Sequence, residues 1–131
     1  IRFAYRCQNG VCYLEIALVR SLLLNLLDNA QKAMDQGGTV LIRQEMTADG
    51  CRICVQDEGR GIPTESLAHL TEAFYRVDKA RSREQGGVGL GLALCQEIVL
   101  LHHGTMRFEN RRDGQGACVT VELKGGRPCA Q

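Results

Sequence analysis

The fold is decided by residues 16–34, which read IALVRSLLLNLLDNAQKAM. Apolar residues recur there at helical spacing and Gly37-Gly38 ends the pattern, so we predict a helix over this stretch. Asn25, Asn29 and Lys32 stand at i, i+4 and i+7 and therefore share the opposite face of that helix. Because mid-helix asparagines lower helix propensity, this stripe predicts either a polyphosphate and metal site or an ordinary solvated face.

The segments on both sides of this helix show the alternation of β-strands. Residues 1–6 alternate, and Asn9-Gly10 is a strong hairpin signal, so we expect the chain to open with a hairpin whose second strand runs from Val11 to Leu14. The stretches from Thr39 to Met46 and from Cys51 to Gln56 are rich in strand formers and are joined by an Asp-Gly turn. They predict a second hairpin.

The second half of the chain supplies further helices and strands. Pro63 fits the first turn of a short helix to about His69, and apolar periodicity resumes from Leu90 to Leu101. Two strands are expected after it, at Thr105 to Glu109 and at Ala117 to Leu123. Together these elements predict an α+β fold, a two-layer α/β sandwich with about three helices on one face of a mixed sheet of about five strands.

Length and charge narrow the classes of protein. The 131 residues are expected to form one domain, 1–131, and the formal net charge of +1 provides no bulk field for nucleic acid or an anionic membrane. No apolar run reaches the roughly 20 residues of a membrane span, and the start shows no signal-peptide pattern. Because the first residue is Ile1 rather than Met, we expect a fragment of a longer protein.

The cysteines give little sign of a structural role. Seven of them form an odd count among apolar neighbours, which fits no disulfide framework and favours a reducing, cytoplasmic setting. Cys51 and Cys54 have a zinc-like spacing, but on a strand their side chains point to opposite faces and no second pair or nearby His completes a site. We therefore expect neither a disulfide nor a zinc site.

Two glycine-rich stretches carry candidate chemistry. Residues 57–63, DEGRGIP, place an acid at a strand end before two glycines that allow close backbone approach to a ligand. The carboxylate could accept a hydrogen bond from an adenine amine, although Asp and Gly are also ordinary turn residues. Residues 86–92, GGVGLGL, run straight into a helix, where backbone N–H groups can face phosphate oxygens. This spacing is neither the dinucleotide fingerprint nor the phosphate loop.

Between these stretches, residues 74–83, FYRVDKARSR, place an aromatic anchor ahead of several cations. A lid that closes on a nucleotide needs such an anchor and at least one phosphate-facing cation, while a solvated charged loop is the alternative. The run from Arg76 to Gly87 is polar and bounded by glycines, which predicts a mobile loop.

In this order and at these intervals, the four motifs resemble those of the catalytic domain of sensor histidine kinases, a branch of the GHKL ATPase superfamily with the Bergerat fold. The likeness covers almost the whole chain. Residues 25–32 look like the family's N box, 57–61 its first glycine box, 74–76 its F box and 87–91 its second glycine box.

The resemblance implies a role for each motif residue. Asn29 would coordinate magnesium, and Asn25 and Lys32 would help hold the triphosphate of ATP. Asp57 would bind the adenine amine, and Arg76 would reach the γ-phosphate from the lid. The remaining nucleotide-binding positions that it implies are Gly59, Gly61, Ile62, Phe74, Gly87, Gly89, Leu90, Gly91 and Leu92.

Two positions depart from the family pattern. Ala33 and Met34 follow the N-box Lys, where many relatives carry an aromatic residue that packs on the nucleotide, so the contact is expected to be weaker or to come from Met34. Gly116-Ala117 stands where many relatives have Ser or Thr, which is expected to remove a polar contact near the base.

The N box also separates kinases from hydrolases. GHKL hydrolases such as DNA gyrase carry a Glu four residues before the magnesium Asn to activate water, and here that position is Asn25. An amide cannot act as a general base, so the resemblance implies a protein-histidine kinase that transfers the γ-phosphate of magnesium-ATP in two-component signal transduction. The alternative is a GHKL-type ATPase that hydrolyses ATP to drive conformational change.

The histidines indicate what lies outside this piece. None of His69, His102 and His103 is followed by the acid and Pro of an acceptor histidine, so the acceptor is expected on a separate dimerisation and phosphotransfer domain of the same protein. We interpret His102 and His103 as helix C-terminal residues whose partial positive charge suits the helix dipole. The expected partners are ATP or ADP, that domain and, indirectly, a response regulator. By family analogy the full-length protein is a membrane-anchored dimer with this domain in the cytoplasm, without nucleic acid or direct membrane contact.

Overall fold

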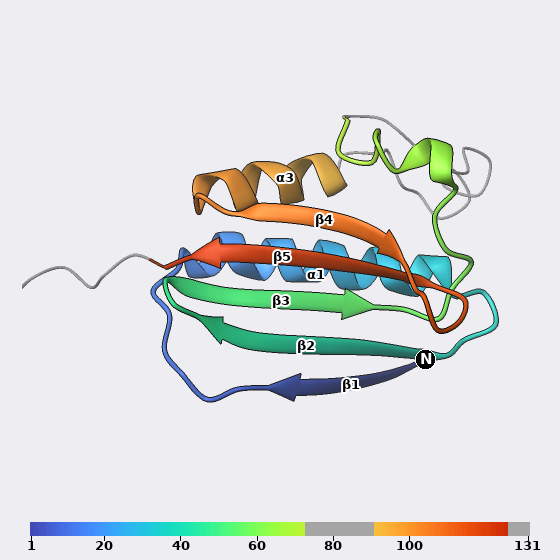
Figure 1. The fold of residues 1–131 in the computed structure, drawn as a ribbon, viewed down its shortest axis with the longest axis horizontal. Coiled ribbons are helices and arrows are strands. Elements are labelled where there is room, and N and C mark those ends of the chain that lie inside the picture. The colour runs from blue at the N-terminus through green and yellow to red at the C-terminus, as the bar shows by residue number, and fades with distance from the viewer. Residues whose placement is uncertain (73–90, 126–131) are drawn as a thin grey trace, which may run out of the picture.

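The computed structural model describes residues 1–72 and 91–125. Within these residues a five-stranded sheet carries two α-helices on one face, and a short 3-10 helix follows the third strand (Figure 1). The elements in chain order are β1 (Arg2–Cys7), α1 (Ile16–Ala33), β2 (Thr39–Thr47), β3 (Gly50–Gln56), η1 (Thr64–Ser66), α3 (Gly91–Leu101), β4 (Thr105–Asn110) and β5 (Ala117–Lys124). The predicted α+β sandwich with a mixed sheet is therefore confirmed.

The strand order is β1-β2-β3-β5-β4. β1 lies parallel to β2, because α1 carries the chain across the sheet between them, and the other three neighbouring pairs are antiparallel. The predicted hairpin of β2 and β3 is formed, with Thr47 paired to Gly50 at its end. Figure 1 views the sheet from the side away from α1, so that α1 runs behind β3 and β5.

The predicted opening hairpin is wrong. β1 pairs with β2 instead, and beyond it Gln8 N–H donates to the Gln44 carbonyl while the Met46 N–H donates to Gln8 Oε1. Gly10 lies so close to β2 that an added Cβ would be 2.7 Å from Met46 Cγ. The Asn9-Gly10 pair thus follows the edge of β2 and then leads to α1, because the backbone of β1 finds its partners on β2 rather than on the residues that follow.

The core lies between the sheet and the two helices, and its members come from all of these elements. The leucine stripe of α1 packs against α3 and against the inward residues of β2, β3 and β5. Each fully buried aliphatic side chain contributes roughly 1.5–3 kcal/mol, so this stripe anchors α1 with its polar side turned away from the sheet. The least exposed core side chains are Leu22, Leu26, Val40, Cys95, Ile98, Val99, Val121 and Leu123.

The predicted short helix after Pro63 is present only as the 3-10 turn η1, followed by turns as far as Thr71. The described part of the chain thus has two α-helices and one 3-10 helix where about three helices were expected. No helix among the described residues is long and apolar enough to cross a bilayer.

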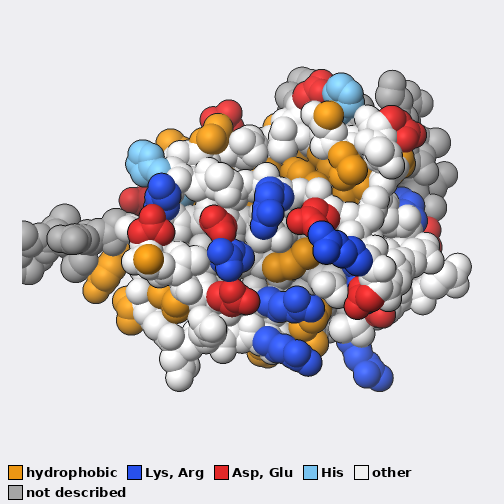
Figure 2. Space-filling view, in the orientation of Figure 1, with side chains coloured by type: hydrophobic (Ala, Val, Ile, Leu, Met, Phe, Trp, Pro, Cys, Tyr) orange, Lys and Arg blue, Asp and Glu red, His pale blue; other side chains and the backbone are white. Residues whose placement is uncertain are grey.

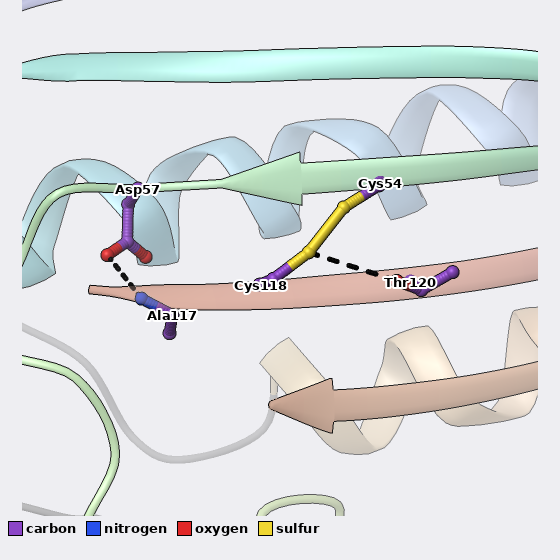
Figure 3. Close-up of a disulfide and its surroundings, with 5 residues drawn as sticks. All are labelled: Cys54, Asp57, Ala117, Cys118 and Thr120. Atoms are coloured by element: carbon purple, nitrogen blue, oxygen red, sulfur yellow. Dashed lines mark hydrogen bonds between the residues drawn. A yellow bond between two sulfur atoms is a disulfide. The ribbon is translucent and has the colours of Figure 1, made fainter. Parts of the chain in front are cut away.

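The expectation that the cysteines form no disulfide is wrong for one pair. Cys51 is buried on the helix side of β3 and Cys54 lies on the open side, as strand alternation predicts. Cys54 is bonded there to Cys118 of the neighbouring strand β5, with the two Cα atoms 6.6 Å apart (Figure 3). The two residues are 64 positions apart in sequence, so only the β3–β5 pairing brings them together.

Candidate functional site

The polar stripe predicted on α1 is present. Asn25 Nδ2 donates to the Ser21 carbonyl at 2.8 Å, and its Oδ1 points toward the start of α3. A Cβ at Gly91 would lie only 2.9 Å from that oxygen, so the glycine allows α3 to begin directly beside Asn25. The N box and the last glycine of the second glycine box are thereby brought together.

Asn29 lies one helical turn further along the same stripe. Its Nδ2 is buried and has no hydrogen-bond partner among the described residues. A buried polar group without a partner costs about 1–3 kcal/mol, so such a group points to a partner beyond the described residues. This amide is the clearest sign of a ligand on α1.

Lys32 stands another turn along and forms an ion pair with Asp28, its Nζ being 2.8 Å from Oδ2. This i, i+4 pair is partly exposed, and such pairs contribute only a few tenths of a kcal/mol. The ammonium group can therefore exchange this partner for a phosphate at little cost.

Asp57 forms a closed corner at the end of β3. Its backbone N–H donates to the Ala117 carbonyl, and its Oδ1 accepts from the N–H groups of Gly59 at 2.9 Å and Ala117 at 3.1 Å. The residue is only 7% exposed, and among the described residues no hydrogen bond reaches its other oxygen, Oδ2. The protein thus fixes this carboxylate by one oxygen and leaves the second as an acceptor.

Gly59 and Arg60 attach this corner to the end of α1. A Cβ at Gly59 would lie 2.4 Å from the Ala33 carbonyl oxygen, which also accepts the Arg60 N–H at 3.2 Å. The guanidinium Nη1 of Arg60 donates to the Lys32 carbonyl. Gly59 is thus required here by its close contact with the helix, while Arg60 satisfies two of the last carbonyls of α1.

Gly61 and Ile62 are held by a residue that sequence reasoning missed. Asn110, at the end of β4, accepts the Ile62 N–H at 2.7 Å and donates to the Ile62 carbonyl at 2.8 Å. Gly61 has φ +79°, and an added Cβ would lie 2.9 Å from Asn110 Oδ1. A polar residue at a strand end gives no sequence signal for this role, because the contact joins residues 48 positions apart.

Gly116-Ala117 lies beside Asp57. The Ala117 backbone N–H donates a hydrogen bond to Asp57 Oδ1, while the predicted loss of a polar side-chain contact near the base stays a prediction. Gly116 has φ +132°, and a Cβ there would lie 2.1 Å from the Asp57 carbonyl oxygen, so only glycine fits. Met34 is a core residue, 4% exposed, whose Sδ accepts the Glu58 N–H at 3.4 Å.

The interpretation of His102 as a positively charged helix end is wrong. This buried ring accepts the Glu15 N–H at Nε2, so the proton lies on Nδ1, which donates to the Ile98 carbonyl at 2.9 Å. The neutral ring joins the start of α1 to the end of α3. His103 is exposed and adopts φ 54°, and His69 forms an ion pair with Glu72.

The described residues gather part of the predicted site. Asn25, Asn29, Lys32, Asp57, Gly59, Gly61, Ile62 and Gly91 all lie along or against the polar side of α1 or at its Asp57 end, whereas Leu92 packs against the hydrophobic core. Phe74, Arg76, Gly87, Gly89, Leu90 and the predicted lid lie outside the described residues. No group of three His, Cys, Asp or Glu that could hold a metal occurs within 1–72 and 91–125.

Comparison with known proteins shows which family has this arrangement. Residues 15–127 match the family described as "Histidine kinase-, DNA gyrase B-, and HSP90-like ATPase". Sensor protein BasS of Escherichia coli is 37% identical over 84% of this chain and 29% of its own length. Sensor histidine kinase WalK of Bacillus subtilis is 37% identical over 80% of this chain and 17% of its own length. The chain therefore spans less than a third of these relatives.

Two solved structures superpose on this chain. The mycobacterial sensor histidine kinase MprB superposes with a TM-score of 0.82 at 29% identity, covering 95% of this chain and 83% of that one. Full-length ShkA superposes with a TM-score of 0.77 at 26% identity, covering 98% of this chain and 26% of that one. The second structure is a complex with AMPPNP.

Proposed function

This chain belongs to the histidine kinase-, DNA gyrase B- and HSP90-like ATPase family as a sensor histidine kinase catalytic domain, and we propose that it binds magnesium-ATP along the polar side of α1. The γ-phosphate then passes to a histidine on a separate dimerisation domain in two-component signal transduction. The observation that carries this proposal is the buried Nδ2 of Asn29, which has no hydrogen-bond partner among the described residues and lies midway between two corners that the chain itself builds.

The two corners set the direction of the nucleotide. Gly91 lies against Asn25, and Gly59 lies against Ala33, eight residues further along α1. Eight residues of helix span roughly 12 Å, enough for a base at one end and phosphates at the other. α3 begins at Gly91, and its positive end favours phosphate at the Asn25 end. The adenine therefore belongs at the Asp57 end, with Oδ2 of Asp57 accepting a hydrogen bond from its amine.

Magnesium fits the residues present. It takes oxygen ligands and is usually bound by one or two protein groups together with substrate phosphates, rather than by a dedicated protein cage. The Asn29 side chain would supply one such oxygen through Oδ1, while its buried Nδ2, which has no partner among the described residues, would donate to a phosphate oxygen. The lack of any carboxylate cluster among the described residues agrees with this mode. When bound, the ion would neutralise charge on the phosphates. Asn29 would hold it, and Asn25, Lys32 and Arg76 would orient the triphosphate.

Transfer is favoured over hydrolysis by the residue at position 25. The Asn25 amide already donates to the Ser21 carbonyl and has no basic atom that could take a proton from water. Glu15 is bound through its backbone N–H to His102, ten residues or roughly 15 Å along α1 from Asn25. A GHKL-type ATPase is the second candidate, and it would need a general base from outside these residues.

The remaining parts of the system follow from this chemistry. The acceptor histidine would lie on the dimerisation domain of the same protein, and a response regulator would then take the phosphate. We place the domain in the cytoplasm, where ATP is available, with no nucleic acid or direct membrane contact. The complex of the similar ShkA with AMPPNP supports binding of an adenine nucleotide here.

Titration of the purified chain with ATP, ADP and GTP, with and without magnesium, tests the proposal. We expect ATP and ADP to bind more tightly than GTP, and ATP to gain from magnesium. Equal affinity for ATP and GTP would remove Asp57 from the base site, and no binding of any nucleotide would overturn the proposed function itself.

A further inference from the structure

The open face of the sheet carries a site of a different kind. Figure 2 shows Lys and Arg side chains across this face, opposite the helices, interspersed with Asp and Glu. One row of residues crosses all five strands, each member directly beside the next in the strand register. It runs through Arg6, Arg43, Cys54, Thr120 and Arg107.

Within this row Cys54 has one cationic neighbour on the adjacent strand and a second cation one strand further away. Arg43 is its direct partner on β2, is exposed, and forms no ion pair with any described residue. On the other side, Thr120 separates Cys54 from Arg107, which is likewise exposed and unpaired within the described part of the chain. Cationic neighbours favour the thiolate, which is the form of a cysteine that attacks a disulfide. The free Cys51 and Cys95 are both buried, so a reagent in solution does not reach their sulfur atoms.

Cys54 also has a resolving partner in place. Cys118 stands on β5 diagonally across from Cys54, and in the structure the two are joined (Figure 3). Their Cα separation of 6.6 Å lies within the usual range for disulfides, so the sheet needs no rearrangement to form the bond. Both residues are half-buried, which leaves them open to a small reagent.

The same two strands hold the base end of the proposed site. Cys118 directly follows Ala117, whose N–H donates to Asp57 Oδ1, and Cys54 precedes Asp57 by three residues on β3. Figure 3 shows Asp57 and Ala117 beside the disulfide, across the same pair of strands. A covalent bond between the strands at this point limits the separation of Asp57 from Ala117.

We propose that Cys54 and Cys118 are a reversible thiol site that reacts with low-molecular-weight disulfides such as oxidised glutathione, and that its oxidised form tightens nucleotide binding through Asp57. The second half of this inference rests on the proposed function. The gain comes from preorganisation, since a carboxylate already held in position loses less freedom when the base binds.

The proposed reaction is a thiol–disulfide exchange in two steps. The Cys54 thiolate attacks one sulfur of oxidised glutathione, forming a mixed disulfide and releasing one glutathione thiolate. Cys118 then loses its proton to solvent and attacks the Cys54 sulfur, which forms the protein disulfide and releases the second glutathione. Two electrons pass from the protein dithiol to the small disulfide, and no other oxidant is required.

The test starts from the fully reduced 131-residue chain. It is incubated with oxidised glutathione, the Cys54–Cys118 linkage is followed by peptide mass spectrometry, and ADP is titrated into both redox forms. We expect the linkage to form and the ADP dissociation constant to fall about threefold to tenfold. Cys118→Ser should fix the affinity at the reduced value in both conditions, as should Cys54→Ser. Cys7→Ser, which removes an exposed cysteine on β1, should leave the redox dependence intact.

The Arg43→Gln variant tests the rate of disulfide formation separately from the effect of the disulfide on ADP binding. It should slow formation of the linkage several-fold while leaving the ADP affinity of the oxidised form unchanged. The inference is overturned if the linkage does not form, or if it forms and ADP affinity stays within about twofold. Loss of ADP binding in both redox forms would instead contradict the proposed function, and the rate comparison with Arg43→Gln would still decide the thiol site.

Discussion

The Asp57 corner and the middle of the polar stripe on α1 differ in how much of their hydrogen bonding the protein completes by itself. At the Asp57 corner, backbone groups of Gly59 and Ala117 fix one carboxylate oxygen, and Asn110 fixes the loop that follows. In the middle of the stripe, Nδ2 of Asn29 is buried with no partner among the described residues.

The difference indicates which part of the nucleotide binds at each place. A base is flat and chemically constant, so a prebuilt corner can select it before anything else binds. Phosphates and magnesium bring their own charge and ligands, so the protein can leave an amide unpaired for them to complete.

The largest effect is expected at Asn29, in the middle of the stripe. Asn29→Ala should slow phosphotransfer to a supplied acceptor domain by about 100- to 1,000-fold, since it removes an oxygen ligand at the transferring phosphate. The melting temperature should stay the same or rise slightly, because no described hydrogen bond of the Nδ2 group is lost. Exposed Gln31 on the same helix provides the matched control, and Gln31→Ala should transfer at the normal rate. A variant at Asn29 that melts lower and transfers normally would make the residue structural.

At the prebuilt end the expected effect is selective rather than total. Asp57→Asn keeps an acceptor for Gly59 and Ala117 but weakens the charged acceptor offered to adenine. A hydrogen bond to a charged group contributes about 1.5–3 kcal/mol, so the preference for ATP over GTP should fall by about 10- to 100-fold. Competition titration with both nucleotides measures this. Unchanged preference would show that the corner holds the fold and not the base.

A smaller effect is expected from the support of that corner. Asn110→Ala removes both hydrogen bonds to Ile62 and should weaken ATP binding about threefold to tenfold, with about 1 kcal/mol lost from the free energy of unfolding. Asn110→Asp keeps the acceptor for the Ile62 N–H and should recover part of the affinity. If both variants bind as the parent does, the loop does not position the nucleotide.

The smallest effect is expected at two buried thiols, Cys51 and Cys95. Burial raises the pKa of Cys51 to about 11 and that of Cys95 to about 12. Because only the thiolate reacts, both should resist alkylation at pH 8 and react faster as the pH rises toward these values, whereas exposed Cys7 should react at once. Mass spectrometry of iodoacetamide-treated protein checks the order. Rapid labelling of Cys95 at pH 8 would show that the α1–α3 packing opens readily.

Local patterns predicted most of the elements and the motifs of this chain. The leucine period predicted the end of α1 to within a residue. Residues 57–63 and 86–92 stood out by residue type and spacing, and their interpretation as glycine boxes came from the resemblance to the kinase family. The opening hairpin failed, because a turn signal states only that a chain can reverse, whereas the backbone partners of β1 were available on β2.

Contacts between distant residues could not be predicted in this way. Asn110 meets Ile62 and Cys54 meets Cys118 only once β3, β5 and β4 are neighbours, and no residue type near either pair signals its partner. His102 shows the same limit, since its neutral state follows from the Glu15 N–H that the fold brings to it. Sequence thus pointed to the proposed ligand-binding residues more readily than to the residues that position them.

The most direct test of the central claim counts bound and hydrolysed nucleotide in one sample of the purified chain with magnesium and ATP. The account predicts saturable ATP binding with phosphate release near background, because Asn25 offers no general base. Asn25→Glu should raise release, a general base typically contributing roughly 100- to 10,000-fold. Robust, magnesium-dependent multiple turnover by the parent chain would contradict the account and favour a hydrolase.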